Sequence, residues 1–172
     1  MGKNTVYLSL GSNLGDRAAT LLEALERLRQ LGGIVAVSSL YETEPVEVAL
    51  EDLQPWYLNC AVAIESGLTP DQFLAATQAV ELALGRQRVG RRHDPRTLDI
   101  DILLFGESVV KTAELTIPHP GLARRRFVLQ PLAEIAPDVR HPILKKTVRE
   151  MLAGLPAQAR VRRLEHGLHW GQ

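Results

Sequence analysis

Residues 98–105, LDIDILLF, decide the fold, because apolar and acidic side chains alternate along them. Alternation with a period of two is typical of a β-strand that has one buried face. Asp99 and Asp101 then lie on one face, and the other face should pack against helices. The residues on that apolar face are Leu98, Ile100, Ile102 and Leu104.

The sequence before this strand predicts three more strands and two helices. A strand around Val6–Leu10 leads into a turn, Gly11–Gly15, and Asp16 caps a helix that ends at Gly32 and Gly33. The second and third strands are expected over 34–41 and 57–66. The second helix should begin at Thr69, with Pro70 in its first turn and Gln72 completing a capping box, and end at Gly85.

The resulting order, β-α-β-β-α-β, predicts a ferredoxin-like α+β fold with helices on one face of an antiparallel sheet. A C-terminal extension begins near residue 107. In it we expect one or two helical turns over 131–137, and a helix that Thr147 opens with Glu150 as its capping-box partner. We expect residues 1–172 to form a single domain.

Composition excludes several classes of protein. The 172 residues are 45% hydrophobic and 23% charged, which indicates a globular chain rather than a disordered or coiled-coil one. Lys plus Arg balances Asp plus Glu at 20 each, so a general nucleic-acid or membrane-surface binder is disfavoured. Cys60 is the single cysteine, which rules out an internal disulfide. With no signal peptide or membrane span in the sequence, we expect a cytoplasmic protein.

Asp99 and Asp101 are a candidate cation site. Two carboxylates roughly 7 Å apart on one strand face repel each other unless a cation lies between them. Mg²⁺ binds through one or two carboxylates and completes its shell with water and phosphate oxygens. The alternatives are a solvated strand face and aspartates that pair with nearby arginines.

An arginine-rich loop leads directly into this acidic pair. Arginine matches phosphate oxygens with a planar fork and stays charged at every working pH. A cation site beside such a loop suits phosphoryl transfer, although a solvated loop remains the alternative. The arginines of the loop are Arg86, Arg88, Arg91, Arg92 and Arg96.

Tyr57 and Asn59 lie two residues apart on the predicted third strand and therefore face the same way. A flat heterocycle could stack on Tyr57 and on Phe127, while the amide of Asn59 reads its donors and acceptors. For each ring taken alone, ordinary core packing is the alternative.

The sequence closely resembles the 6-hydroxymethyl-7,8-dihydropterin pyrophosphokinases of folate biosynthesis. The segment PRTLDIDILLF at 95–105 is close to a signature of that family, and the similarity spans about residues 5 to 140. The other matching stretches are GSNL at 11–14, SSLYETEP at 38–45, YLN at 57–59, ELALGR at 81–86, IPHP at 117–120 and RFVLQPL at 126–132.

The resemblance implies a kinase that moves the terminal diphosphate of ATP to the pterin's hydroxymethyl oxygen, with two Mg²⁺ ions on Asp99 and Asp101. The resemblance also implies that Arg86 and Arg96 are catalytic residues, together with Asp99 and Asp101. The implied ATP-binding residues are Glu81, Arg88, Ile102, Thr116, His119 and Arg125. The implied pterin-binding residues are Thr43, Pro45, Val46, Tyr57, Asn59, Asp99 and Phe127. Family members are usually monomeric, so we expect a monomer.

Two positions depart from the family pattern. His93 stands in the arginine loop where members often have tryptophan, so loop closure should use a different contact. Glu114 replaces an arginine found in some members. Arg160, Arg162 and Arg163 match nothing to which a role can be assigned.

Two other functions use the same fold class. An RNA-binding module would place aromatic residues on the sheet face, where this chain places aspartates that repel a phosphodiester backbone. A non-catalytic sensor would need the heterocycle pocket without the acidic pair or the arginine loop. The presence of both favours catalysis.

Overall fold

A six-stranded sheet forms the centre of the molecule. The computed structural model describes residues 2–12, 16–43, 56–85, 98–156 and 161–164. Neighbouring strands are antiparallel in the order β5-β1-β4-β3-β8, and β2 also pairs with β4, which confirms the predicted ferredoxin-like arrangement. The strands are β1 (Asn4–Ser12), β2 (Gly33–Val37), β3 (Tyr41–Thr43), β4 (Tyr57–Ser66), β5 (Asp99–Phe105) and β8 (Val161–Arg163).

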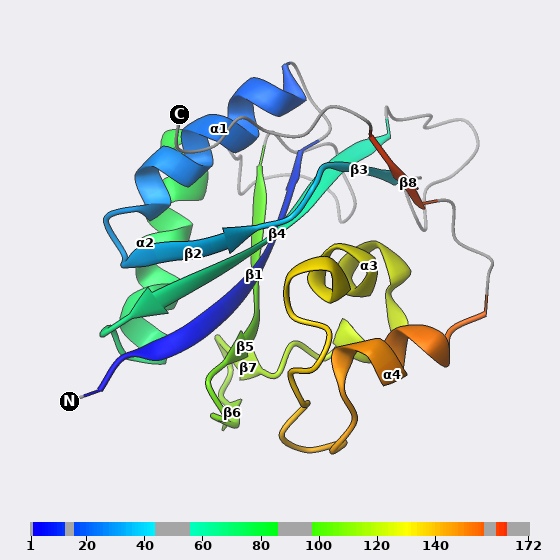
Figure 1. Ribbon diagram of the computed structural model, residues 1–172. Coiled ribbons are helices and arrows are strands. Elements are labelled where there is room, and N and C mark those ends of the chain that lie inside the picture. The colour runs from blue at the N-terminus through cyan, green and yellow to red at the C-terminus, as the bar shows by residue number, and fades with distance from the viewer. Residues whose placement is uncertain (1, 13–15, 44–55, 86–97, 157–160, 165–172) are drawn as a thin grey trace.

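Helices α1 (Arg17–Leu28) and α2 (Pro70–Ala83) cover one face of this sheet (Figure 1). Both begin where the sequence predicts, since Asp16 caps α1 and Thr69 caps α2. Their buried residues pack on alternate positions of the strands and form the larger apolar core. Its members include Leu21, Leu25, Phe73, Val80, Val62, Ile100 and Ile102.

The position of α1 and α2 on one face confirms the arrangement predicted for the β-α-β-β-α-β part, and the C-terminal extension, whose position was not predicted, covers the opposite face (Figure 1). It contains the hairpin β6 (Val110–Lys111) and β7 (Thr116–Ile117), and a 3₁₀ turn, Leu122–Arg124. Helices α3 (Arg126–Ile135) and α4 (Val148–Ala153) follow. These helices enclose a second apolar core, whose members include Ala61, Leu103, Leu104, Val128, Leu129 and Leu132.

A β-bulge interrupts the alternation of β5. Leu8 pairs with Ile102 but Tyr7 pairs with Leu104, so Leu103 is the extra residue. The extra residue reverses the side on which the following side chains point. The sequence predicted that Leu104 shares a face with Leu98, Ile100 and Ile102. Because of the bulge, Leu104 belongs to the second core instead.

The strand expected over 34–41 is divided in two at Ser38. The hydroxyl of Ser38 accepts a hydrogen bond from the Ala61 N–H at 2.8 Å, in the place of a backbone carbonyl. The Ser38 N–H still donates to the Ala61 oxygen at 2.9 Å. Because the Ser38 hydroxyl takes the place of a backbone acceptor, the regular hydrogen-bond ladder of β2 ends here. Pairing with β4 resumes at Tyr41 in β3.

Two further boundaries differ from those expected. Gly11 and Ser12 are the last residues of β1 rather than part of a turn. Helix α3 starts at Arg126 and contains Pro131, whereas only one or two turns over 131–137 were predicted. Helix α4 confirms the predicted capping box of Thr147 and Glu150.

Candidate functional site

A row of residues crosses the sheet and assembles the site. Asp99 on β5 pairs with Gly11 on β1, Gly11 pairs with Asn59 on β4, and Asn59 pairs with Tyr41 on β3. Residues opposite each other on antiparallel strands share a face. The row faces α3, because Ala61, two residues after Asn59, belongs to the core that α3 covers.

The acidic pair lies half-exposed on that face. Asp99 and Asp101 are both intermediate in exposure, and 43% of the Asp101 side chain is accessible. Between them, the Ile100 N–H donates to Oε2 of Glu81 at 2.9 Å. Glu81 is a buried residue of α2, so the helix on the opposite face anchors the backbone that carries the two carboxylates.

The bulge in β5 positions His119 beside this pair. The extra residue, Leu103, accepts a hydrogen bond from the His119 N–H at 3.0 Å. The His119 side chain accepts from the Gly121 N–H through Nδ1 at 3.0 Å, and Nε2 lies 3.9 Å from Oδ1 of Asp101. Since Nδ1 is an acceptor, the neutral ring carries its proton on Nε2 and directs it toward the acidic pair.

The environment of His119 favours this neutral form. Burial lowers the pKa of His119 below the ordinary value of 6.5, and the charge of Arg125 lowers it further, while Asp99 opposes the shift. A neutral imidazole at working pH can donate to a phosphate oxygen through Nε2.

Arg125 lies at the start of α3 and contacts its surroundings closely. Its guanidinium carbon is 5.8 Å from the centre of the Phe127 ring. A Cβ on Gly121 would lie 2.6 Å from Nε of Arg125, so the arginine side chain packs against this glycine and would shift if a side chain were added there. The result is an exposed cation held between Gly121 and Phe127, within the electrostatic range of His119.

The other end of the row contains amide, hydroxyl and aromatic groups. Asn59 is buried and its Nδ2 donates to Oγ1 of Thr43 at 2.5 Å. Tyr57 pairs with Thr43 and is partly exposed. A Cβ on Gly11 would lie 2.6 Å from Oδ1 of Asn59, so the glycine makes room for the amide. The carboxylates of this sheet face thus lie beside an imidazole and a cation, and the same face carries groups suited to a polar heterocycle.

The family model of 7,8-dihydro-6-hydroxymethylpterin-pyrophosphokinase (HPPK) matches residues 7–137, which is more than half of the chain. The chain belongs to this family. The resemblance seen in the sequence is thereby confirmed, and the chain is a pyrophosphokinase, a class of ATP-dependent transferase.

Relatives in two bacteria carry the same family name. The 2-amino-4-hydroxy-6-hydroxymethyldihydropteridine pyrophosphokinase of Methylorubrum extorquens is 48% identical over 151 residues, which are 87% of this chain and 92% of that protein. The enzyme of that name in Bacillus subtilis is 46% identical over 138 residues, which are 79% of this chain and 80% of that protein.

A solved structure supports the fold of this family member. The wild-type HPPK-DHPS of Plasmodium falciparum, crystallised with pterin and p-hydroxybenzoate, superposes with a TM-score of 0.70 at 19% identity. The match covers 89% of this chain and 42% of that longer one. At this identity the likeness concerns the fold alone.

Most of the predicted HPPK site residues that the structure describes come together near the α3 face. Asp99, Asp101, Asn59 and Tyr57 lie on it, as the register requires. Ile102 differs, because its side chain is buried in the core under α1 and α2, so an ATP contact there could use only its backbone. Five predicted residues and His93 lie outside the described residues: Pro45, Val46, Arg86, Arg88 and Arg96.

The remaining predicted nucleotide residues fall on different elements. Thr116 is half-buried on β7, opposite Lys111, in the hairpin beside β5. Glu81 is directed at the β5 backbone from beneath the sheet, as described above.

Sequence reasoning missed two parts of the site. Gly11 was predicted to lie in a turn, because its contact with Asn59 depends on the pairing of β1 with β4, which the sequence does not show. A polar cluster of Ser39, Tyr41, Glu134 and Arg163 was not predicted, and the Ser-Ser-x-Tyr spacing at 38–41 was its one signal.

Within the described residues, no group of three or more His, Cys, Asp or Glu side chains could hold a metal. A pair of carboxylates fits Mg²⁺ better than a transition metal, because Mg²⁺ leaves several positions to water and phosphate. Among the helices of the same residues, none has the length and hydropathy of a membrane span.

Proposed function

We propose that this site transfers the terminal diphosphate of ATP to the hydroxymethyl oxygen of 6-hydroxymethyl-7,8-dihydropterin, a step of folate biosynthesis. The oxygen attacks the β-phosphorus of ATP, the bond from that phosphorus to the oxygen of the α-phosphate breaks, and AMP leaves. Family membership supports the reaction. The structural observation that carries the proposal is the row that joins Asp99, Gly11 and Asn59 on one face of the sheet.

Asp99 and Asp101 are the residues that would hold two Mg²⁺ ions. Bound Mg²⁺ would neutralise phosphate charge and orient the β- and γ-phosphates. The fit rests on the donor chemistry, since both groups are half-exposed carboxylates on one strand. Glu81 supports them by holding the Ile100 N–H between the two, which limits movement of the pair.

The nucleotide would lie on the side of His119 and Arg125. His119 presents an Nε2 proton next to Asp101, and Arg125 supplies a fixed charge that a phosphate can bind. Arg86, Arg88 and Arg96 are proposed to complete the charge stabilisation from the loop before β5, with Arg86 and Arg96 acting on the leaving AMP. Thr116 and the Ile102 backbone are proposed contacts to the rest of ATP.

The pterin would lie over Asn59 and Thr43. The Asn59 amide and the Thr43 hydroxyl are buried and already bonded to each other, so both are preorganised to meet a heterocycle's donors and acceptors. Tyr57 and Phe127 are proposed to stack on the two sides of the ring. Pro45 and Val46 are proposed to close the pocket.

The test is an incubation of the purified protein with ATP, Mg²⁺ and the pterin, followed by chromatography of the nucleotides. We expect AMP only when the pterin is present. ADP would instead indicate an ordinary kinase, and pterin binding without turnover would indicate a sensor.

Two isosteric variants test the acidic pair. Asp99→Asn and Asp101→Asn should each lower turnover by about 1000-fold, because each loses a charged metal ligand while the shape is kept. Asp138→Asn is the matched control, since this exposed carboxylate pairs with Arg149 away from the site. Unchanged turnover of the first two variants at saturating Mg²⁺ would contradict the assignment.

We also propose that the chain acts as a cytoplasmic monomer, without nucleic-acid or membrane partners. The zero formal net charge supports the absence of a polyanionic partner. Light scattering at working concentration measures the oligomeric state, and a dimer mass would contradict this part of the proposal.

A further inference from the structure

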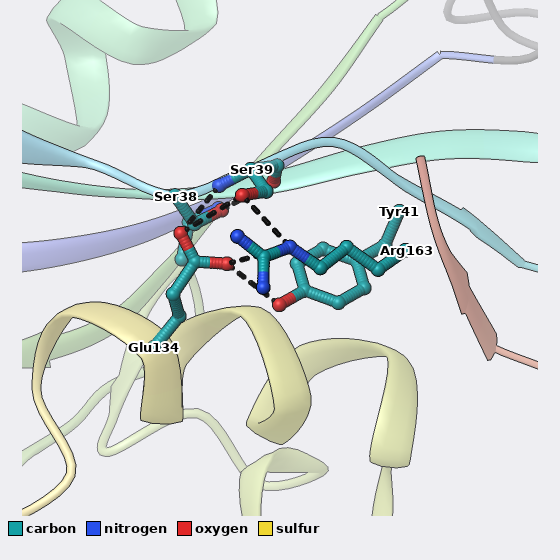
Figure 2. Close-up of polar contacts among 6 residues, drawn as sticks. Ser38, Ser39, Tyr41, Glu134 and Arg163 are labelled. Atoms are coloured by element: carbon teal, nitrogen blue, oxygen red, sulfur yellow. Dashed lines mark hydrogen bonds and ion pairs between the residues drawn. The ribbon is translucent and has the colours of Figure 1, made fainter. Parts of the chain in front are cut away.

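Glu134 joins three segments that are distant in the sequence (Figure 2). Its Oε2 accepts hydrogen bonds from the N–H and the hydroxyl of Ser39, at 2.8 and 3.1 Å. Its Oε1 accepts from the hydroxyl of Tyr41 at 2.7 Å. Arg163 on β8 adds its charge at 4.0 Å from Oε1 and donates to the Ser39 hydroxyl at 3.1 Å. We refer to Ser39, Tyr41, Glu134 and Arg163 as the brace.

The protonation state of the brace suits this geometry. Burial raises the pKa of Tyr41, and its hydrogen bond to Glu134 and the charge of Glu134 raise it further. Tyr41 therefore remains a phenol that donates to the carboxylate over the whole working range of pH. Such charge-assisted bonds are about twice as strong as neutral ones.

The brace connects the two sides of the proposed pterin site. Phe127 and Glu134 are seven residues apart on α3, so they lie on nearly the same helix face, about two turns from each other. Tyr41 and Thr43 are two residues apart on β3 and share a face of that strand. The bond from Tyr41 to Glu134 thus fixes the helix that carries Phe127 relative to the strand that carries Thr43.

Neither element is positioned strongly by its own local structure. Strand β3 has three residues, and α3 lacks a side-chain cap at its N-terminus and contains Pro131. Apolar packing of Val128, Leu129 and Leu132 holds α3 on the sheet, but such packing is not directional. The brace supplies directional bonds at the point where α3 meets the edge of the sheet.

We propose that Glu134 and Tyr41 are positioning residues for the pterin, which set the separation between α3 and β3. The proposal rests on the proposed function of the site. The proposed pterin contacts come from both sides of the brace, from Phe127 and from Thr43. The proposed nucleotide residues include Arg125 at the start of α3 but none on β3, so a change in the separation of α3 and β3 affects the pterin site from both sides. Loss of the brace should therefore weaken pterin binding more than ATP binding.

Steady-state kinetics of Glu134→Gln and Tyr41→Phe test the proposal. We expect KM for the pterin to rise about five- to tenfold in each variant, which is the effect of losing one part-buried hydrogen bond to a charged group. KM for ATP should change less than about twofold. Because the Tyr41 hydroxyl acts through its bond to Glu134, the double variant should be no worse than about twofold beyond Glu134→Gln.

Asp138→Asn is again the matched control, because it makes the same change of carboxylate to amide at an exposed site just beyond α3. It should leave both KM values unchanged. Ser39→Ala removes only one hydroxyl from the brace and serves if Glu134→Gln does not fold.

Unfolding in urea separates positioning from mere stabilisation. A lower urea midpoint with wild-type KM values for the active fraction would overturn the proposal. Equal increases of both KM values would overturn it too. The wild-type protein is assayed alongside, so failure of the proposed reaction shows as absence of AMP in the wild type. Failure of the inference shows as an active wild type whose variants match the control.

Discussion

Gly11 on β1 lies directly beside the side chain of Asn59 on β4. An added Cβ would lie 2.6 Å from Oδ1 of the buried Asn59, a distance that real side chains do not tolerate. Gly11→Ala should therefore displace the Asn59 amide from Thr43, to which it donates at 2.5 Å. We expect a loss of about 1–3 kcal/mol in the free energy of unfolding, and a KM for the pterin about tenfold higher.

Gly33→Ala provides the matched control for this substitution. Gly33 is also in a strand, but a Cβ there would meet nothing within 4 Å. The free energy of unfolding should remain within about 0.5 kcal/mol of the wild type. The KM for the pterin should remain within about twofold of the wild type. Urea unfolding and initial rates measure both quantities, and equal behaviour of the two variants would contradict the steric argument at Gly11.

His141 should make stability depend on pH. Its Nδ1 accepts hydrogen bonds from the N–H groups of Ile143 and Leu144 at 3.2 and 3.1 Å, and burial lowers its pKa below 6.5. The unfolded chain then binds more protons than the folded one as pH falls through 6.5. The free energy of unfolding should consequently decrease on acidification, until the pH passes the lowered pKa of the folded state.

His141→Asn keeps an acceptor but cannot titrate. Between about pH 7.5 and about pH 5.5, its free energy of unfolding should fall less than that of the wild type. Every other titrating group, including His119, is present in both proteins, so the difference between the two slopes belongs to His141. Parallel slopes in urea-unfolding experiments would show that His141 does not contribute.

At the scale of elements, α2 supports the site through Glu81, which lies near the C-terminal end of the helix. The helix begins with a capping box, in which Oγ1 of Thr69 accepts from the Gln72 N–H and Oε1 of Gln72 accepts from the Thr69 N–H. Glu81 bonds to β5 three turns later. Thr69→Ala should cost about 1 kcal/mol of the free energy of unfolding. Turnover at 25 °C should not change, because Phe73 and Val80 keep the helix packed.

Thr69→Ser is the rescue variant, since it retains the capping hydroxyl. Chemical denaturation should place it within about 0.5 kcal/mol of the wild type. Normal stability with reduced turnover in Thr69→Ala would contradict the prediction, because it would show that the cap affects the site rather than the stability of the fold.

The elements also show what sequence can predict. The two capping boxes and the alternation of 98–102 are local patterns, and the structure confirms them. The bulge at Leu103 is not local, because it depends on how β5 pairs with Tyr7 and Leu8. Strand β8 has exposed arginines and exists through its pairing with β3, so its three residues carry no pattern of their own.

The residues of the site also fall into those that local sequence patterns predict and those that depend on tertiary contacts. Asp99 and Asp101 could be predicted from one strand, and Asn59 with Tyr57 from another. Gly11 and Glu134 could not, because their roles arise from a steric contact across strands and from hydrogen bonds that span more than ninety residues. Helix α3 was underestimated since Pro131 disfavours a helix, and tertiary packing of Leu129 and Leu132 overrides that preference.

At the scale of the whole molecule, one sheet separates two apolar cores. Strand β4 sends Cys60 and Val62 into the core under α1 and α2, and Ala61 into the core under α3. Strand β5 does the same with Ile102 and Leu103 on either side. Because both cores share these strands, loss of one core leaves one face of the sheet without packing. The strands on which the other core depends are then less stable.

We therefore expect the two cores to unfold together. Leu25→Ala, in the core under α1, and Leu129→Ala, in the core under α3, both truncate side chains with 0% exposure. Each should lower the free energy of unfolding by about 2–5 kcal/mol, and each should shift one single transition. Calorimetry checks this, because the calorimetric and van't Hoff enthalpies agree for a two-state protein. A Leu129→Ala protein that loses α3 and α4 in a separate, earlier transition would show instead that the site face is an independent unit. In that case, the proposed pterin site would open without unfolding the rest of the sheet.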